Sequence, residues 1–294
     1  MTDFLQHVVD ALSLGSLYAV LAIGIALIFG IMNLINFAYG ELIMIGAYTL
    51  FLLDGTPWPF QLAACLLVTI IAAVLMERLA FRPFRGASAP VLLVTSFALS
   101  FALQSLATVI FTSRAKGFSL PSWFDDPITI GSIDFSSLNL ITFLVMVVLV
   151  GGLAAFLQRS MLGIQMRAAA ENFRTAQLVG VRSNVVIATA FALSGLFAGV
   201  AAILIVAQGG TATPSMGSGP VLIAFVATII GGLGSLYGAA YGGFFLGVLT
   251  VILQVVLPDA LAPYRDAFLY AGVVLILLLR PQGLIVVKSR FERV

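Results

Sequence analysis

Glu41 is the side chain of this sequence best placed to do chemistry, because it is an acid between two apolar segments, residues 37–40 and 42–45. A carboxylate in apolar surroundings is costly unless it is paired, lies at a helix end or reaches water. If a helix begins near Gly40, Glu41 lies in its first turn and complements the positive end of the helix dipole. Alternatively, the carboxylate contacts a polar solute or forms part of a gate.

The other reactive residue types do not form a catalytic or metal-binding set. The chain has one cysteine, Cys65, inside an apolar run, and one histidine, His7, near the N-terminus. A lone cysteine provides neither an intrachain disulfide nor a metal site. The phosphate loop Gly-x-x-x-x-Gly-Lys-Ser/Thr is absent, so the chain does not bind ATP by that device. We therefore expect no enzyme activity, no cofactor, no metal and no bound nucleic acid.

Composition indicates that lipid surrounds these residues. Of the 294 residues, 61% are hydrophobic and 9% are charged, whereas a soluble domain is about 45–50% apolar and about 25% charged. A spanning helix needs about 20 mostly apolar residues, and the apolar runs here do not alternate as barrel strands do. The sequence predicts an all-α polytopic membrane protein with about eight or nine transmembrane segments. Eight runs are candidates: residues 12–29, 62–76, 90–111, 138–157, 185–207, 221–230, 238–257 and 267–279.

The distribution of charge predicts how these segments are oriented. Most of the basic residues lie in three places, residues 78–85, 158–184 and 280–293. Short loops rich in Lys and Arg stay in the cytoplasm, and the acidic residues, such as Asp54 and Asp125, fall mostly in the other connections. We therefore expect a periplasmic N-terminus and a cytoplasmic C-terminus.

Two places indicate interrupted helices. Asn33 and Asn36 precede Glu41, and amide side chains within a membrane usually satisfy broken backbone or bridge helices. Residues 231–235 are four small residues and one leucine, without a strong helical pattern. Non-helical backbone at membrane depth is tolerated only where protein or a water-filled cavity covers it. Either place is therefore a short re-entrant turn or an inner loop.

The sequence predicts one transmembrane domain, residues 1–294, with a polar cytoplasmic loop at about residues 158–184. Within that loop, residues 166–178 are predicted to form one short surface helix. Arg167 and Glu171 are four residues apart, and Glu171 and Arg174 are three apart, so they can pair along one face. Such a short polar helix buries little in its own chain, and we expect it to dock on a partner. A plain solvated loop is the alternative.

Glycines recur at four-residue spacing in the later apolar runs, which lets two helix backbones approach closely in lipid. We expect these glycines to pack helices within the chain, and contact with another subunit is the alternative. The pairs are Gly195 and Gly199, Gly238 and Gly242, and Gly243 and Gly247.

Several segments, in this order, resemble the bacterial branched-chain amino acid ABC transporter permeases of the LivH type. The resemblance covers nearly the whole chain, and one departure is Tyr39, where the family commonly has His. The segments that carry it are Leu-Gly-Ser-Leu-Tyr-Ala at residues 14–19, Asn-Phe-Ala-Tyr-Gly-Glu at 36–41, residues 163–181, Ile-Gly-Gly-Leu-Gly-Ser at 230–235 and Arg-Pro-Gln-Gly-Leu at 280–284.

This resemblance implies a partnership in the bacterial inner membrane. The chain would be one half of an import channel for a branched-chain amino acid, or a related small amino acid or amide, beside a second permease of the LivM type. Two cytoplasmic ATPase subunits would drive the channel and a periplasmic solute-binding protein would supply it. A self-sufficient homo-oligomeric channel or facilitator for a small polar solute is the alternative.

Two sets of residues are expected to carry this function. Residues 166–178 match the region of the family's coupling helix, so the resemblance makes residues 158–184 a cytoplasmic coupling loop. The expected ATPase-coupling residues are Arg167, Ala168, Ala170, Glu171, Arg174 and Leu178. The expected solute path contains Asn36, Glu41, Thr95 and Ser96.

Overall fold

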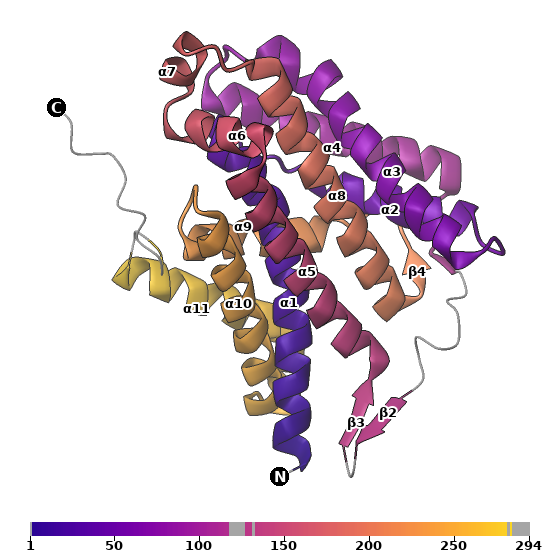
Figure 1. The fold of residues 1–294 in the computed structure, drawn as a ribbon. Helices are drawn as coiled ribbons and strands as arrows, with labels where there is room; N and C mark the ends of the chain where they lie inside the picture. The colour runs from indigo at the N-terminus through magenta and orange to yellow at the C-terminus, as the bar shows by residue number, and fades with distance from the viewer. Residues whose placement is uncertain (1, 118–126, 131–132, 281–282, 284–294) are drawn as a thin grey trace.

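The computed structural model describes residues 2–117, 127–130, 133–280 and 283, and most of them are helical (Figure 1). Each of the eight expected apolar runs coincides with a helix. Seven segments of the described chain are long and apolar enough to cross a membrane. Their helices are α1 (Thr2–Met32), α3 (Trp58–Met76, continued by a π-helical turn, Glu77–Phe81, and a 3₁₀ turn, Arg82–Phe84), α4 (Ala89–Phe111), α5 (Ser137–Arg159), α8 (Ser183–Gly209), α10 (Leu236–Val256) and α11 (Arg265–Leu279, after a 3₁₀ turn, Asp259–Tyr264).

Two further apolar helices are short. Both α2 (Tyr39–Leu52) and α9 (Ser218–Gly231) have 14 residues, which is about 21 Å at the rise of an α-helix and less than the roughly 30 Å hydrocarbon core of a bilayer. A Cβ atom on Gly40 would lie 2.5 Å from the carbonyl oxygen of Gly217. The start of α2 therefore lies directly against the segment that leads into α9.

The two expected interruptions are present. The chain leaves helical conformation after Met32, passes Asn33 with φ of 51°, and enters α2 at Tyr39. The second interruption separates α9 from α10, where Gly232 and Gly234 have φ of 103° and 91°. Asn33 is costlier in this left-handed region than a glycine would be, and such strain is often retained near functional sites.

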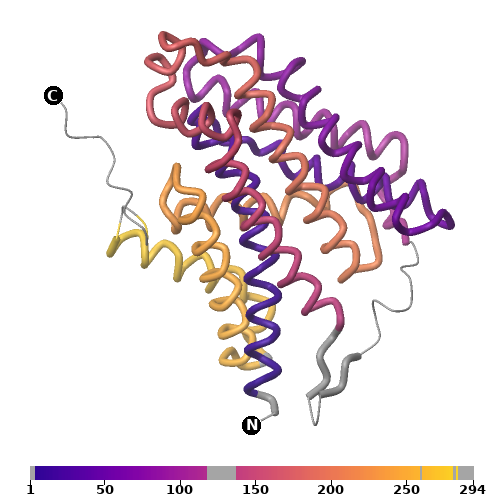
Figure 2. Tube along the Cα trace, in the orientation of Figure 1, coloured from indigo at the N-terminus to yellow at the C-terminus, as the bar shows by residue number. Residues whose placement is uncertain are grey.

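Helix α1 runs through the middle of the bundle, with α10 beside it (Figure 2). Gly243 and Gly247 of α10 lie against the backbone of α1 around Ala19 and Gly15, because a Cβ atom on either glycine would come within 2.5 Å of that backbone. Gly195 of α8 is packed in the same way on α3. The expectation that these glycines pack helices within the chain is confirmed.

Two connections, between α4 and α5 and between α8 and α9, contain short strands. Strand β1 (Lys116–Gly117) pairs with β4 (Thr211–Ala212), and β2 (Pro127–Ile130) pairs with β3 (Ile133–Ser136), both antiparallel. In the coupling loop the structure has two helices, α6 (Met161–Glu171) and α7 (Phe173–Leu178), so the prediction of one helix over residues 166–178 is wrong. The basic residues Lys288, Arg290 and Arg293 of the tail, most of the motif at 280–284, and Asp125 lie outside the described residues.

Candidate functional site

Glu41 lies in the first turn of α2, as the sequence predicts, and is 2% exposed. Its position there is favourable because the positive end of the helix dipole faces the carboxylate. Ahead of it, the side-chain oxygen of Asn36 accepts a hydrogen bond from the backbone N–H of Ala38 at 3.1 Å. This local bond fixes the turn through which the chain enters α2.

A second helix supplies the partner of this carboxylate. The hydroxyl of Ser100, on α4, donates a hydrogen bond to Oε1 of Glu41 at 2.8 Å. The other oxygen, Oε2, is buried and has no hydrogen-bond partner among the described residues. A buried carboxylate oxygen without a hydrogen-bond donor is destabilising. A ligand that donates a hydrogen bond to Oε2 would remove this cost.

Aromatic rings lie next to this hydrogen bond. Phe37, four residues before Glu41, stacks on Phe97, three residues before Ser100, with ring centroids 4.3 Å apart. Phe225 of α9 packs against Phe37 with the ring centroids 5.5 Å apart. Further along, Tyr48 of α2 stacks on Phe111 of α4 at 4.1 Å. Helices α2 and α4 therefore run in the same direction along a line of contacts, which we call the α2–α4 seam, from Phe37–Phe97 to Tyr48–Phe111.

A cavity lies at each end of the seam. An apolar cavity of about 240 Å³ lies between α2 and α4 beyond the Glu41–Ser100 bond, and Met44, Tyr48, Leu103 and Ala107 are among its walls. A larger cavity of about 860 Å³ lies at the other end of α4 and includes Leu92. Because Leu92, Ser100, Leu103 and Ala107 recur at helical spacing, a single face of α4 borders both cavities and carries Ser100 between them.

The remaining residues of the expected solute path have their polar atoms engaged elsewhere. Thr95 donates to the carbonyl of Val91 at 2.8 Å, and the buried Ser96 donates to that of Leu93 at 2.8 Å, both within α4. The amide of Asn36 is directed to the sulfur of Met76 at 3.8 Å. Of the four expected path residues, only Glu41 therefore presents a free polar atom at the seam.

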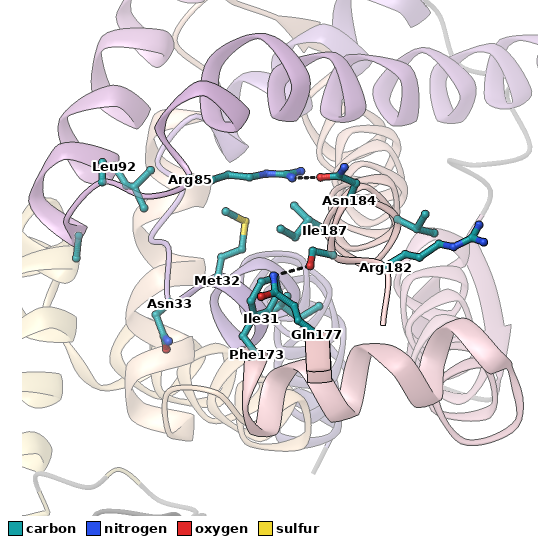
Figure 3. Close-up of a pocket in the computed structure, with 14 residues that line it drawn as sticks. Ile31, Met32, Asn33, Arg85, Leu92, Phe173, Gln177, Arg182, Asn184 and Ile187 are labelled. Carbon is teal, nitrogen blue, oxygen red and sulfur yellow. Dashed lines mark hydrogen bonds between the residues drawn. The ribbon is translucent and has the colours of Figure 1, made fainter. Parts of the chain in front are cut away.

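Charged and polar side chains, Arg85, Arg182, Gln177 and Asn184 among them, lie between the apolar residues that line the larger cavity (Figure 3). Arg85 donates to the buried carboxylate of Glu77, at the end of α3, and to the side-chain oxygen of Asn184, at the start of α8. Gln177 of α7 donates to the hydroxyl of Ser183 at 2.7 Å. Polar contacts thus join α7, α8 and the segment before α4 around one cavity.

The coupling loop combines a buried and an exposed surface. Asn172 separates α6 from α7 in an extended conformation, and its side chain caps α7 by accepting from the N–H of Thr175 at 3.0 Å. Gly163, Met166, Ala169 and Ala176 are buried against the bundle. Of the expected coupling residues, Ala168 is half-buried and the others are exposed, namely Arg167, Ala170, Glu171, Arg174 and Leu178.

Comparison with known proteins identifies the kind of molecule to which this arrangement belongs. Residues 7–279 match the family described as the branched-chain amino acid transport system permease component. The chain belongs to this permease family. It is 34% identical to the high-affinity branched-chain amino acid transport system permease protein BraD of Pseudomonas aeruginosa, over 96% of this chain and 95% of BraD. It is 32% identical to LivH of Escherichia coli K12, over the same shares, and 28% identical to a probable LivH of Methanocaldococcus jannaschii, over 92% and 86%.

The permease is thus a multi-pass membrane protein of a transport family whose members are transport subunits and not enzymes. Its sequence did not point to Ser100, Phe97 or Arg85 as site residues. Ser100 is one of several hydroxyls on α4, and its pairing with Glu41, 59 residues away, depends on tertiary packing. Arg85 is one of several basic residues in its loop, and it lies eight residues after Glu77, outside the three- or four-residue spacing that indicates an ion pair on a helix.

Proposed function

We propose that the permease is one half of the translocation pathway of an ATP-driven importer of branched-chain amino acids in the bacterial inner membrane. A second permease of the LivM type forms the other half, two cytoplasmic ATPase subunits drive the pair, and a periplasmic binding protein delivers the solute. The family supports the transport role, and BraD and LivH, which cover nearly the whole chain, are named for branched-chain amino acids.

The exposed surface of α6 and α7 carries the proposal of an ATPase partner. Leu178 is 88% exposed although it is apolar, and it lies beside the exposed Arg174. A rigid element that is anchored on one face and bears an apolar residue and cations on the other fits a docking surface better than a solvated loop. Through such an element, closure of the ATPases would move the membrane helices as rigid bodies.

Charge supports the proposed orientation. With the N-terminus in the periplasm, the Arg-rich segments at residues 78–85 and 158–184 face the cytoplasm, as short basic loops do. The larger cavity, with Arg85 and Arg182, then opens at the cytoplasmic end of the seam, and the smaller apolar cavity lies toward the periplasm. The α2–α4 seam, with Glu41 between the two cavities, is our proposed contribution of this chain to the solute path.

Purification of the tagged chain from its native membrane in mild detergent tests the assembly. We expect mass spectrometry to count two ATPases and one related permease for each copy of this chain. Recovery of the chain alone or as a homo-oligomer, under conditions that keep a known ABC complex intact, would contradict the proposal and favour a self-sufficient channel. Uptake of labelled leucine, isoleucine and valine by the complex in proteoliposomes, with binding protein and ATP, then tests the solute class.

A further inference from the structure

We propose that the α2–α4 seam contains a transient binding site for an amino acid zwitterion, in which Oε2 of Glu41 receives the α-ammonium group and the apolar cavity receives an aliphatic side chain. This inference rests on the proposed function, because it assumes that the permease transports small amino acids. It assigns the recognition of charge and the recognition of shape to different residues, and each can be changed separately.

The first argument is that one carboxylate oxygen of Glu41 has no hydrogen-bond donor among the described residues. The carboxylate is 2% exposed, and one of its oxygens has no donor among the described residues. Glu41 does not take part in the ion pairs of the described residues, which include Arg85–Glu77 and Arg265–Asp266, so no cation of this part of the chain neutralises it. An ammonium group carries a positive charge and up to three N–H donors, and so supplies both missing interactions at once.

The second argument is the position and the size of the apolar cavity. Met44 and Ile45 follow Glu41 by one helical turn on α2, and Leu103 follows Ser100 by one turn on α4; all three line the cavity. A solute whose ammonium group is at Glu41 therefore places its side chain among apolar walls. The volume of about 240 Å³ lies below the roughly 300–1,000 Å³ of pockets for drug-sized ligands, and suits a small aliphatic group.

The third argument is that the seam is closed on the far side of Glu41. Along the two segments, the stacked rings of Phe37 and Phe97, with Phe225 beside them, come after the cavity residues Asn33 and Leu92 and before Glu41 and Ser100. The lining of the smaller cavity also stops short of Glu41 itself, so the solute reaches Oε2 only when α4 moves away from α2 at Ser100. Helix α4 is suited to that movement, because only 11% of its apolar window is buried within the chain.

The test uses the full complex, with its ATPases and binding protein, in proteoliposomes. Glu41→Gln preserves the shape and an acceptor for Ser100 but removes the charge, whereas Ser100→Ala removes the hydrogen bond and preserves the charge. We expect leucine uptake to fall at least roughly tenfold in E41Q, a factor that corresponds to about 1.4 kcal/mol, with ATP hydrolysis still stimulated by the loaded binding protein. Ser100→Ala and Glu41→Asp should retain more uptake than E41Q. Equal losses in E41Q and S100A, or normal uptake in E41Q, would overturn the inference.

A second variant decides the question if E41Q does not assemble. Ala107 lines the apolar cavity and is 6% exposed, so Ala107→Leu should narrow the cavity and lower the ratio of leucine uptake to valine uptake. A purely structural role of the cavity would reduce both rates together, and an unchanged ratio would overturn the placement of the side chain. If the unaltered complex imports no branched-chain amino acid, the proposed function itself fails. If the unaltered complex imports these amino acids and the variants transport them equally well, only the present inference fails.

Discussion

Arg85 donates to the carboxylate of Glu77 and so ties the segment before α4 to the end of α3. Glu77 is 2% exposed and Arg85 is 20% exposed, so the pair is largely removed from water. The same guanidinium also bonds to Asn184 at the start of α8, which follows the coupling loop. We therefore expect a movement of the start of α8 to act through Arg85 on the segment that leads into α4, the helix that carries Ser100.

Replacement of Arg85 by alanine should destabilise the permease strongly. Removal of one partner of a buried ion pair leaves the other charge uncompensated, which costs about 3–5 kcal/mol. We expect Arg85→Ala to lower the thermal midpoint of the detergent-solubilised protein and Arg82→Ala, at an exposed neighbouring arginine, to change it little. The double variant Glu77→Gln, Arg85→Gln should be more stable than Arg85→Ala, because it leaves no buried charge. Equal midpoints for the two arginine variants would show that the pair contributes nothing.

Reversal of charge in the coupling loop should stop most of the uptake without removing the permease from the membrane. Arg174 is exposed on α7, and Arg167 is exposed on α6; an exposed substitution changes stability by only about 0.5 kcal/mol or less. We therefore expect Arg167→Glu and Arg174→Glu to reach the membrane in normal amounts. Their uptake should fall at least roughly tenfold, which corresponds to a weakening of the ATPase contact by about 1.4 kcal/mol.

Arg114→Glu is the matched control for these reversals, because Arg114 is also exposed but follows α4, at the end of that helix remote from the coupling loop. Its uptake should remain normal. The measurement is labelled uptake divided by the membrane content of the protein. A loss of uptake that is the same in all three variants would mean that charge reversal harms the permease wherever it is placed, and that docking is not the cause.

The elements of this fold follow from the sequence more readily than their contacts do. Glu41 in the first turn of a helix was predictable, because the apolar segment after Gly40 and the dipole rule both refer to neighbouring residues. The break at Asn172 was missed although its signal is local: the alanines at 168–170 favour a continuous helix, but Asn is also a preferred N-cap residue. The Glu41–Ser100 bond had no local signal at all, because it joins residues whose proximity only the packing of α2 and α4 determines.

Gly40→Ala should weaken the junction between α2 and the segment before α9. The added Cβ atom would meet the carbonyl oxygen of Gly217 at 2.5 Å, and this neighbour is backbone that cannot rotate away. Overpacking of this kind typically costs about 1–3 kcal/mol. Gly151→Ala, at a helical position of α5 with open space around it, is the control and should be neutral or stabilising. A thermal midpoint of Gly40→Ala that equals that of Gly151→Ala would contradict the close approach.

Loss of the Phe37–Phe97 stack should open a passive leak between the two cavities. An aromatic pair contributes about 0.5–1.5 kcal/mol beyond the area that it buries, which corresponds to a roughly 2- to 12-fold change in the population of an open seam. We therefore expect Phe97→Ala to speed the efflux of preloaded leucine from proteoliposomes without ATP by a factor in this range. Phe101→Ala is the control, because Phe101 lies one turn further along α4, is 65% exposed and forms none of the described stacks. Efflux that is unchanged in Phe97→Ala, or raised equally in both variants, would show that the stacked rings do not form the barrier.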